Sequence, residues 1–332
     1  MKGWNKVKNR KVAFCTLGCK VNQYETNAMI QEFKKCGYNI VEFDEVADIY
    51  IVNTCTVTNM ADRKSRQMLR KVKELNPEAI LVAVGCYAQV AKEELEKIPE
   101  IDLILGTNEK KDIVSYVEKM LNTKQGDTAN VGQDQSKNLE TENSKFNSIE
   151  KQSSITDVMH CEEYVDFGDV TFTEKTRAVI KVQDGCDRFC SYCIIPFARG
   201  HIRSRKPKSV VSEITKIADE GIKEVVITGI HLASYGRDFS KASVKKTEDE
   251  MNSNFSQEQP NVNTKSDNEY RLIDLLEEIN KIDGIKRIRL RVIRANTYYR
   301  RFCGKIIKTR KNMWPFSSIT PKRMWWNFKK NE

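Results

Sequence analysis

The chain has 332 residues and ten cysteines, which is enough length for two domains that each bury a core. It shows no signal-peptide pattern and no run of about 18 apolar residues, so we expect a cytoplasmic protein with no membrane partner, in which spaced cysteines indicate metal binding or catalysis rather than disulfides. Residues 291–332 hold 12 of the 56 Lys and Arg and one of the 46 acids, leaving 44 basic and 45 acidic residues before them, so the net charge of +10 does not by itself indicate a nucleic-acid partner.

Residues 1–121 alternate between strand-like and helix-like patterns, which favours an α/β domain with an open parallel sheet. The predicted strands are Lys11–Cys15, Ile40–Phe43, Ile49–Val52, Ala79–Val84 and Ile101–Leu105. The predicted helices are Tyr24–Cys36, Met60–Leu75 and Ala88–Lys97.

Two polar stretches are predicted to be a linker and an insertion, because neither has enough apolar residues to bury. They cover residues 122–163 and about 237–269. Residues 164–290 otherwise read strand, helix, strand, helix, strand, which is the repeating unit of a (β/α) barrel in partial form. Residues 291–332 lack this rhythm.

Three cysteines follow the first strand of that second region at C-x3-C-x2-C spacing, namely Cys186, Cys190 and Cys193. Three thiolates would leave one iron of a [4Fe–4S] cluster open to a small ligand such as S-adenosylmethionine. The alternative is a zinc site with His201 as its fourth ligand, although this spacing is not typical of zinc.

Three further cysteines, Cys19, Cys55 and Cys86, each come shortly after a predicted strand. The carboxyl ends of parallel strands share one edge of a sheet, so these residues are predicted to converge on a second open-sided cluster site. The alternative is three small buried residues of the core.

The run KVQDGCDRFCSYCIIPFARGHIRSR resembles radical S-adenosylmethionine methylthiotransferases, in the branch that acts on threonylcarbamoyladenosine in tRNA. TLGCKVNQYET, VNTCTVT and VGCYAQ, around the first three cysteines, support the resemblance. It implies two [4Fe–4S] clusters, S-adenosylmethionine, tRNA as partner, and an electron donor such as flavodoxin or ferredoxin.

The implied reaction attaches a methylthio group to carbon 2 of N6-threonylcarbamoyladenosine at position 37, beside the anticodon. The loop cluster would split S-adenosylmethionine to make the radical, so Cys186, Cys190 and Cys193 are the catalytic residues. The other cluster would hold the sulfur. Cofactor contacts are implied for Tyr192, Gly229 and His231, and a plainly packed histidine is an equal alternative for His231.

Two basic stretches qualify for RNA contact, DRKSRQMLRKVK and ARGHIRSRKPK, with a solvated surface as the alternative for each. Other readings of the chain are a radical enzyme with an auxiliary cluster for electron transfer, and a non-catalytic iron–sulfur or zinc protein.

The resemblance stops after about residue 290, which suggests a reading-frame shift. Met324-Trp325-Trp326 must be encoded ATGTGGTGG, and one base later this reads Cys-Gly-Gly. The preceding residues can then read Ser-Leu-Gln-Ser-Gly, as on a later barrel strand of the family. We therefore expect the activity of the intact gene product rather than of these 332 residues, with a genuine basic RNA-binding tail as the alternative.

Overall fold

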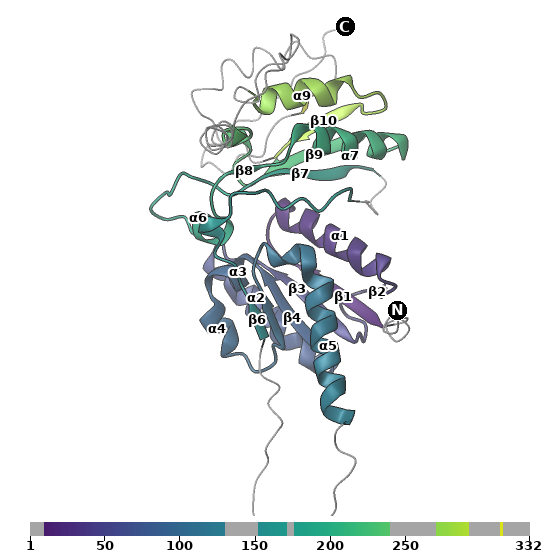
Figure 1. Ribbon diagram of the computed structural model, residues 1–332, viewed down its shortest axis with the longest axis vertical. Coiled ribbons are helices and arrows are strands. Elements are labelled where there is room, and N and C mark those ends of the chain that lie inside the picture. The colour runs from purple at the N-terminus through teal and green to yellow at the C-terminus, as the bar shows by residue number, and fades with distance from the viewer. Residues whose placement is uncertain (1–9, 130–151, 171–175, 240–269, 292–312, 315–332) are drawn as a thin grey trace, which may run out of the picture. The chain divides into compact units, whose positions relative to one another are not determined.

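A computed structural model describes residues 10–129, 152–170, 176–239, 270–291 and 313–314 (Figure 1). The chain divides into two compact units, residues 1–157 and residues 158–332. No helix in these ranges is long and apolar enough to cross a membrane.

The first unit is built on a six-stranded parallel sheet with strand order β2-β1-β3-β4-β5-β6. The strands are β1 Lys11–Thr16, β2 Asn39–Val41, β3 Ile49–Thr54, β4 Ile80–Gly85, β5 Leu103–Leu105 and β6 Gln152–Ser154. Every residue of β3 and β4 is buried, as expected for central strands covered on both faces. The predicted parallel sheet is therefore confirmed.

Helices cover both faces of this sheet. They are α1 Lys20–Lys35, α2 Asn59–Leu75, α3 Cys86–Val90, α4 Lys92–Glu96 and α5 Ile113–Ala129, with a short 3-10 turn η1 Glu109–Asp112. Helices α1 and α5 pack on one face, through side chains such as Phe33 and Val117. Helices α2, α3 and α4 pack on the other, through side chains such as Leu69 and Leu95 (Figure 1).

The structure departs from the predicted elements of the first unit in three places. The predicted helix Ala88–Lys97 is two short helices, because the backbone breaks at Ala91. Helix α5 is not among the predicted helices, and it runs eight residues into the predicted linker, from Asn122 to Ala129. Strand β6 also lies within the predicted linker, and its polar residues join the sheet through backbone pairing with β5 rather than through an apolar pattern.

The second unit has a five-stranded sheet with order β11-β10-β9-β7-β8, in which only β8 is antiparallel to its neighbour. Its strands are β7 Ala178–Asp184, β8 Arg203–Ser204, β9 Glu224–Gly229, β10 Arg287–Leu290 and β11 Met313–Trp314. Its helices and 3-10 turns are η2 Val158–His160, α6 Ile195–Arg199, α7 Pro207–Asp219, η3 Leu232–Ser234 and α9 Leu272–Lys281.

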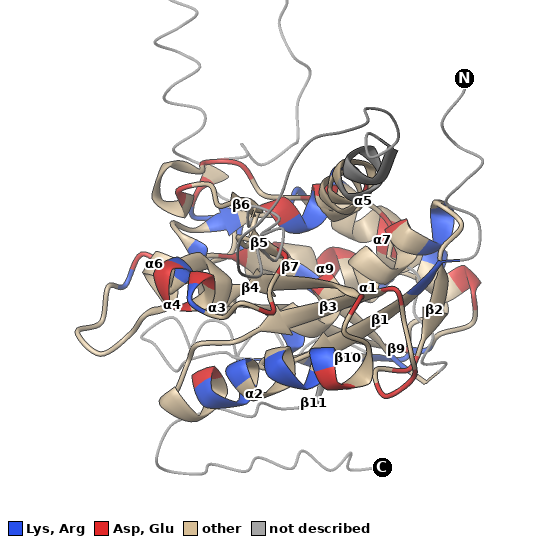
Figure 2. Ribbon diagram, turned by 90° about the horizontal axis from the view of Figure 1, so that it is seen from below, with Lys and Arg blue, Asp and Glu red and all other residues tan. Residues whose placement is uncertain are grey.

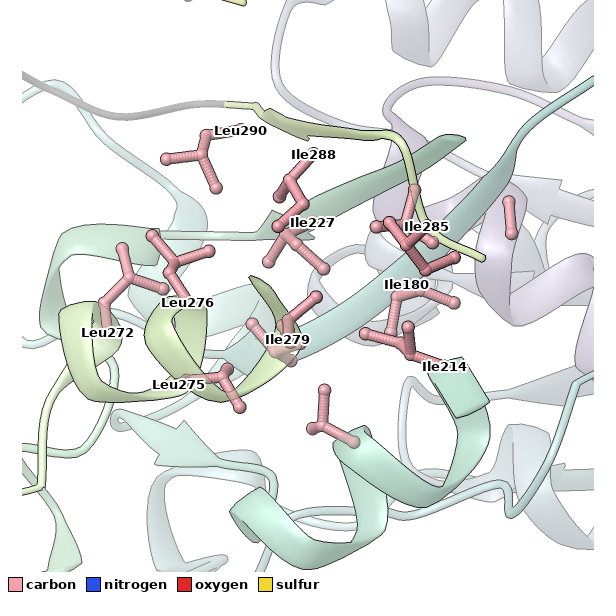
Figure 3. Close-up of a cluster of buried hydrophobic side chains, with 14 of the residues drawn as sticks. Ile180, Ile214, Ile227, Leu272, Leu275, Leu276, Ile279, Ile285, Ile288 and Leu290 are labelled. Carbon is pink, nitrogen blue, oxygen red and sulfur yellow. The ribbon is translucent and has the colours of Figure 1, made fainter. Parts of the chain in front are cut away.

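The core of the second unit lies between this sheet and helices α7 and α9. Figure 3 shows Ile180 and Ile227 of neighbouring strands facing Ile214 of α7 and Ile279 of α9. The predicted β-α-β-α-β order is confirmed, and the fold is an α/β domain with an open parallel sheet, followed by a second α/β unit whose sheet is parallel except for β8. Most of the predicted insertion and of the basic tail lies outside the described residues, apart from 237–239, Arg291 and β11.

Candidate iron–sulfur sites

The three N-terminal cysteines lie at the carboxyl ends of three adjacent strands of the first unit. Cys55 directly follows β3 and Cys86 directly follows β4, and the last residues of these strands, Thr54 and Gly85, are paired in register. Cys19 follows the neighbouring β1 and is the N-cap of α1. Because parallel strands end at one edge, residues 36 and 31 positions apart in sequence share one edge in space.

Two glycines let the backbone approach closely at this edge, which we call the cysteine edge (Cys19, Cys55 and Cys86). Gly18 has φ +96°, and a Cβ there would lie 2.6 Å from Cys55 Sγ. The Cys55 sulfur therefore lies against the backbone that leads into Cys19. Gly85 has φ +106°, and a Cβ there would lie 2.5 Å from Asn53 Oδ1.

A buried set of polar side chains ties these segments together; we call Asn22, Asn53 and Thr54 the amide clamp. Asn22 Nδ2 donates to Leu17 O at 2.8 Å and to Thr54 O at 3.0 Å, which joins the segments before Cys19 and Cys55. Asn53 Nδ2 donates back to Asn22 O at 3.0 Å.

The third segment is held by the hydroxyl of Thr54. Thr54 Oγ1 donates to Val84 O at 2.8 Å and accepts from Ala88 N at 3.3 Å. The segments on either side of Cys86 are thus attached to the residue before Cys55. All three clamp residues are fully buried, where hydrogen bonds are costly to lose.

Tyr87, next to Cys86, connects helices α2 and α3. Its hydroxyl donates to Glu94 Oε2 at 2.6 Å and accepts from Arg66 Nη1 at 2.5 Å. Burial is the main cause that raises the pKa of Tyr87, and the hydrogen bond to Glu94 raises it further. The nearby Arg66 lowers it. The phenol therefore stays protonated and available as a donor.

Cys15 and Cys36, which lie outside the edge, pack against the two apolar cores of the first unit. Burial raises the pKa of the Cys15 thiol despite nearby Lys64 and Lys71, and it also raises the pKa of Cys36. Both shifts favour the neutral thiol, whereas a metal ligand must be a thiolate.

In the second unit, the loop after β7 carries Cys186, Cys190 and Cys193; we call these three residues the cysteine loop. Cys186 N donates to Gly200 O at 2.9 Å, which ties the start of the loop to the end of α6. Cys193 N donates to Cys190 O at 2.9 Å, so a turn brings the last two cysteines together. Gly185 has φ +71°, and a Cβ there would lie 1.7 Å from His201 O.

Buried charges anchor the base of this loop through Asp184. Lys181 Nζ lies 2.5 Å from Asp184 Oδ2 and Arg199 Nη1 lies 3.3 Å from the same oxygen. Asp184 Oδ1 accepts from Gly185 N at 2.9 Å. Two buried cations on one carboxylate fix the strand end, because breaking such a pair leaves a buried charge without compensation.

Gly229 and His231 lie at the carboxyl end of β9, beside the start of the loop. A Cβ on Gly229 would lie 2.8 Å from Gln183 Oε1, so glycine leaves room for that side chain. Gln183 Oε1 accepts from His231 N at 2.7 Å, and its Nε2 donates to Gly185 O at 2.8 Å. His231 is only 2 % exposed and its ring Nδ1 hydrogen-bonds Ser234 Oγ.

The other predicted residues of the loop have different surroundings. Tyr192 is 83 % exposed. His201 Nδ1 lies 2.8 Å from Asp187 Oδ1, and Phe189 packs edge-on against the His201 ring. His201 thus engages a carboxylate within the loop.

The donor set of each trio is thiol alone, which is the ligand type of iron–sulfur clusters. Among residues in the described ranges, no three His, Cys, Asp or Glu side chains lie close enough to share one metal ion. A four-iron cluster makes a different demand, since each thiolate binds its own iron. Each trio consists of thiol side chains alone at a strand-end edge or on one short loop.

Two family profiles match separate parts of the chain. The profile described as "Uncharacterized protein family UPF0004" matches residues 11–106, and the one described as "Radical SAM superfamily" matches residues 180–313. The second match runs past residue 290, where the sequence resemblance was expected to stop.

The chain is also similar to known proteins. It is 35% identical, over 86% of its length and 52% of the relative's, to threonylcarbamoyladenosine tRNA methylthiotransferase MtaB of Bacillus subtilis. It is 34% identical, over 85% of its length and 52% of the relative's, to ribosomal protein uS12 methylthiotransferase RimO of Desulfitobacterium hafniense. A solved structure of the radical S-adenosylmethionine methyltransferase TsrM from Kitasatospora setae aligns with a TM-score of 0.48 and 12% identity, over 92% of this chain and 67% of that one.

An N-terminal domain of the first family joined to a radical S-adenosylmethionine domain defines the class of this protein. The chain belongs to the radical S-adenosylmethionine methylthiotransferase family. It spans about half the length of the curated relatives it matches.

Proposed function

We propose that the protein is a tRNA methylthiotransferase that modifies carbon 2 of N6-threonylcarbamoyladenosine at position 37. The observation that carries the proposal is the pair of cysteine trios. One lies on the edge of a parallel sheet, and the other lies on a loop that is tied down at its base. Each trio offers three ligands and leaves one corner of a four-iron cluster open.

In this proposal Cys186, Cys190 and Cys193 hold the cluster that binds S-adenosylmethionine, with Tyr192, Gly229 and His231 nearby as cofactor contacts. Cys19, Cys55 and Cys86 hold the second cluster. When bound, these groups supply the radical that removes a hydrogen from the base and the sulfur that replaces it.

The residues of the chain itself hold the two sites in shape. Asp184 fixes the strand end that leads into the loop, because it is held by Lys181 and Arg199. The amide clamp fixes the distance between the segments that carry Cys19 and Cys55. Ligands held by rigid, buried hydrogen bonds bind without a further cost of ordering the chain.

The choice of substrate rests on the relatives. The relative from Bacillus subtilis is named for threonylcarbamoyladenosine in tRNA, and the one from Desulfitobacterium hafniense for a ribosomal protein at almost the same identity. We favour tRNA because the residues around Cys186, Cys190 and Cys193 resemble the threonylcarbamoyladenosine branch. A flavodoxin or ferredoxin of the cytoplasm would supply the electrons.

Nucleoside analysis of tRNA from a strain that lacks the gene tests this proposal. We expect the 2-methylthio form of threonylcarbamoyladenosine to disappear and its unmodified precursor to accumulate. The isopentenyladenosine-derived methylthio nucleoside should stay at its normal level, which provides an internal control. Normal levels of both nucleosides, together with loss of the modification on ribosomal protein uS12, would overturn the tRNA assignment.

A further inference from the structure

Helix α2 carries two kinds of basic residue, and only one kind takes part in the fold. Arg66 bonds Tyr87 and Glu94, while Lys73 donates to Pro77 O and Ala79 O and lies 3.5 Å from Asp102. The second kind has exposed side chains, and within the described ranges it makes no ion pair with a carboxylate. We call it the cationic stripe: Arg63, Lys64, Arg70 and Lys71.

The stripe occupies one side of the helix. Arg63 and Arg70 are seven residues apart, as are Lys64 and Lys71, so each pair is stacked about two turns apart along the helix. At about 1.5 Å per residue the stripe is about 12 Å long. Figure 2 shows Lys and Arg repeating along α2, with acids towards its two ends.

The stripe begins close to the cysteine edge. Helix α2 starts at Asn59, four residues after Cys55, with Thr58 as its cap. Val57 and Met60, on either side of that cap, are 53% and 71% exposed. Two exposed apolar side chains therefore lie at the start of α2, next to the cysteine edge, and the four positive charges of the stripe follow them along the same helix.

We propose that the cationic stripe binds the phosphate backbone of RNA and guides it towards the cysteine edge, an inference that rests on the proposed tRNA substrate. Phosphate recognition needs charge and reach rather than a shaped pocket, which is what an open row of Lys and Arg provides. A row about 12 Å long spans several phosphates of one strand. Among the described residues, none of these four side chains makes an ion pair that holds the fold together.

The salt dependence of RNA binding tests the stripe. The full chain with Arg63→Gln, Lys64→Gln, Arg70→Gln and Lys71→Gln is compared with wild type for binding to an unmodified anticodon stem-loop transcript. Each lost phosphate contact lowers the slope of log affinity against log salt by about 0.7 to 0.9, so loss of four contacts lowers it by about 3. At low salt we expect at least about tenfold weaker binding.

A control variant removes the same charge from elsewhere on the chain. Lys34, Lys97, Lys111 and Lys223 are exposed and lie outside α2. Changing all four to Gln should leave the slope near the wild-type value. Equal slopes for the stripe variant and wild type, or equal losses in both variants, would overturn the proposal.

The outcome also separates the stripe from the proposed function. If the stripe variant loses RNA binding while the deletion strain keeps the methylthio nucleoside, the surface stands and the tRNA assignment falls. If the nucleoside is lost in the deletion strain but is restored in full by the stripe variant with an unchanged salt slope, the assignment stands and the surface falls.

Discussion

The two cysteine trios are built in opposite ways. The cysteine loop places its ligands within eight residues of sequence, and its shape depends on contacts at its base such as Cys186 N to Gly200 O. The cysteine edge takes its ligands from three strand ends spread over 68 residues, from Cys19 to Cys86. The loop is thus a local structure, whereas the edge exists only once the parallel sheet has formed.

Burial is mixed within each trio. At the edge Cys55 and Cys86 are buried and Cys19 is exposed, whereas in the loop Cys186 is buried and Cys190 and Cys193 are half-buried beside the exposed Tyr192. A local, open loop suits a site where a small cofactor enters and leaves. An edge tied together by fully buried amides suits a site whose ligand spacing must not change. The difference suggests that each site can be disabled separately.

The largest expected effect comes from Gly185→Ala, which should disable the loop alone. The added Cβ would lie 1.7 Å from His201 O at a positive φ, so the backbone must move, at a cost of about 4 kcal/mol or more. Iron bound per chain should fall by about half, and the iron of the edge should remain. Iron analysis and urea denaturation measure both effects.

The control for that change is Gly221→Ala, also at positive φ but with nothing within 4 Å of the added carbon. Only the backbone conformation is strained there, at a cost of about 1 to 2 kcal/mol. Its iron content should match wild type. Equal iron loss in the two variants would show that the close approach at Gly185 does not shape the loop.

The next effect should come from Asn22→Asp, which attacks the edge alone. The change keeps the shape but removes the amide donor to Leu17 O and Thr54 O and places a carboxylate against two carbonyls. We expect a loss of about 2 to 4 kcal/mol and of the edge iron. Asn39→Asp, at the exposed first residue of β2, should leave the iron content unchanged.

The electron paramagnetic resonance spectrum of the remaining iron in Asn22→Asp gives a readout that a general loss of stability would not produce. We expect the signal that responds to S-adenosylmethionine to be kept and the other signal to be lost. Loss of both signals in equal proportion would mean that the amide clamp supports the whole chain rather than the edge.

The smallest effect should follow Tyr87→Phe, which loosens the edge without removing a ligand. The hydroxyl that joins Arg66 and Glu94 is lost, at a cost of about 1 kcal/mol. In a double-mutant cycle with Glu94→Gln, the double variant should lose less unfolding free energy than the two single variants lose together. Full additivity would contradict the bond between the two side chains.

Much of the fold could be predicted from sequence because the central strands of both sheets are short runs rich in apolar residues. Ile49–Thr54 and Ile80–Gly85 are buried along their whole length, and such strands are easily recognised. Helix α5 was missed although Ile113, Val117 and Met120 recur at helical spacing, because its end lies in a polar stretch. Strand β6 has no apolar pattern, so no sequence rule would find it.

The ligands were predictable and their supports were not. Cysteine spacing and strand ends are visible in sequence, whereas Asn22 and Gln183 act through backbone atoms that become neighbours only in the folded sheet. The sequence did place Asn22 three residues after Cys19, in a motif from which only the cysteine was interpreted. One of the partners of Asp184 is likewise distant in sequence, because Arg199, fifteen residues later, folds back onto it.

Counting iron in the anaerobically reconstituted chain tests the central claim, that two separate trios each hold a cluster with an open corner. We predict about eight irons per chain, about four after Ala replaces Cys19, Cys55 and Cys86, and about four after Ala replaces Cys186, Cys190 and Cys193. S-adenosylmethionine should shift the electron paramagnetic resonance spectrum of the variant that lacks Cys19, Cys55 and Cys86. It should leave the spectrum of the variant that lacks Cys186, Cys190 and Cys193 unchanged. Iron content that neither triple replacement alters, or a spectrum that S-adenosylmethionine never shifts, would contradict the account.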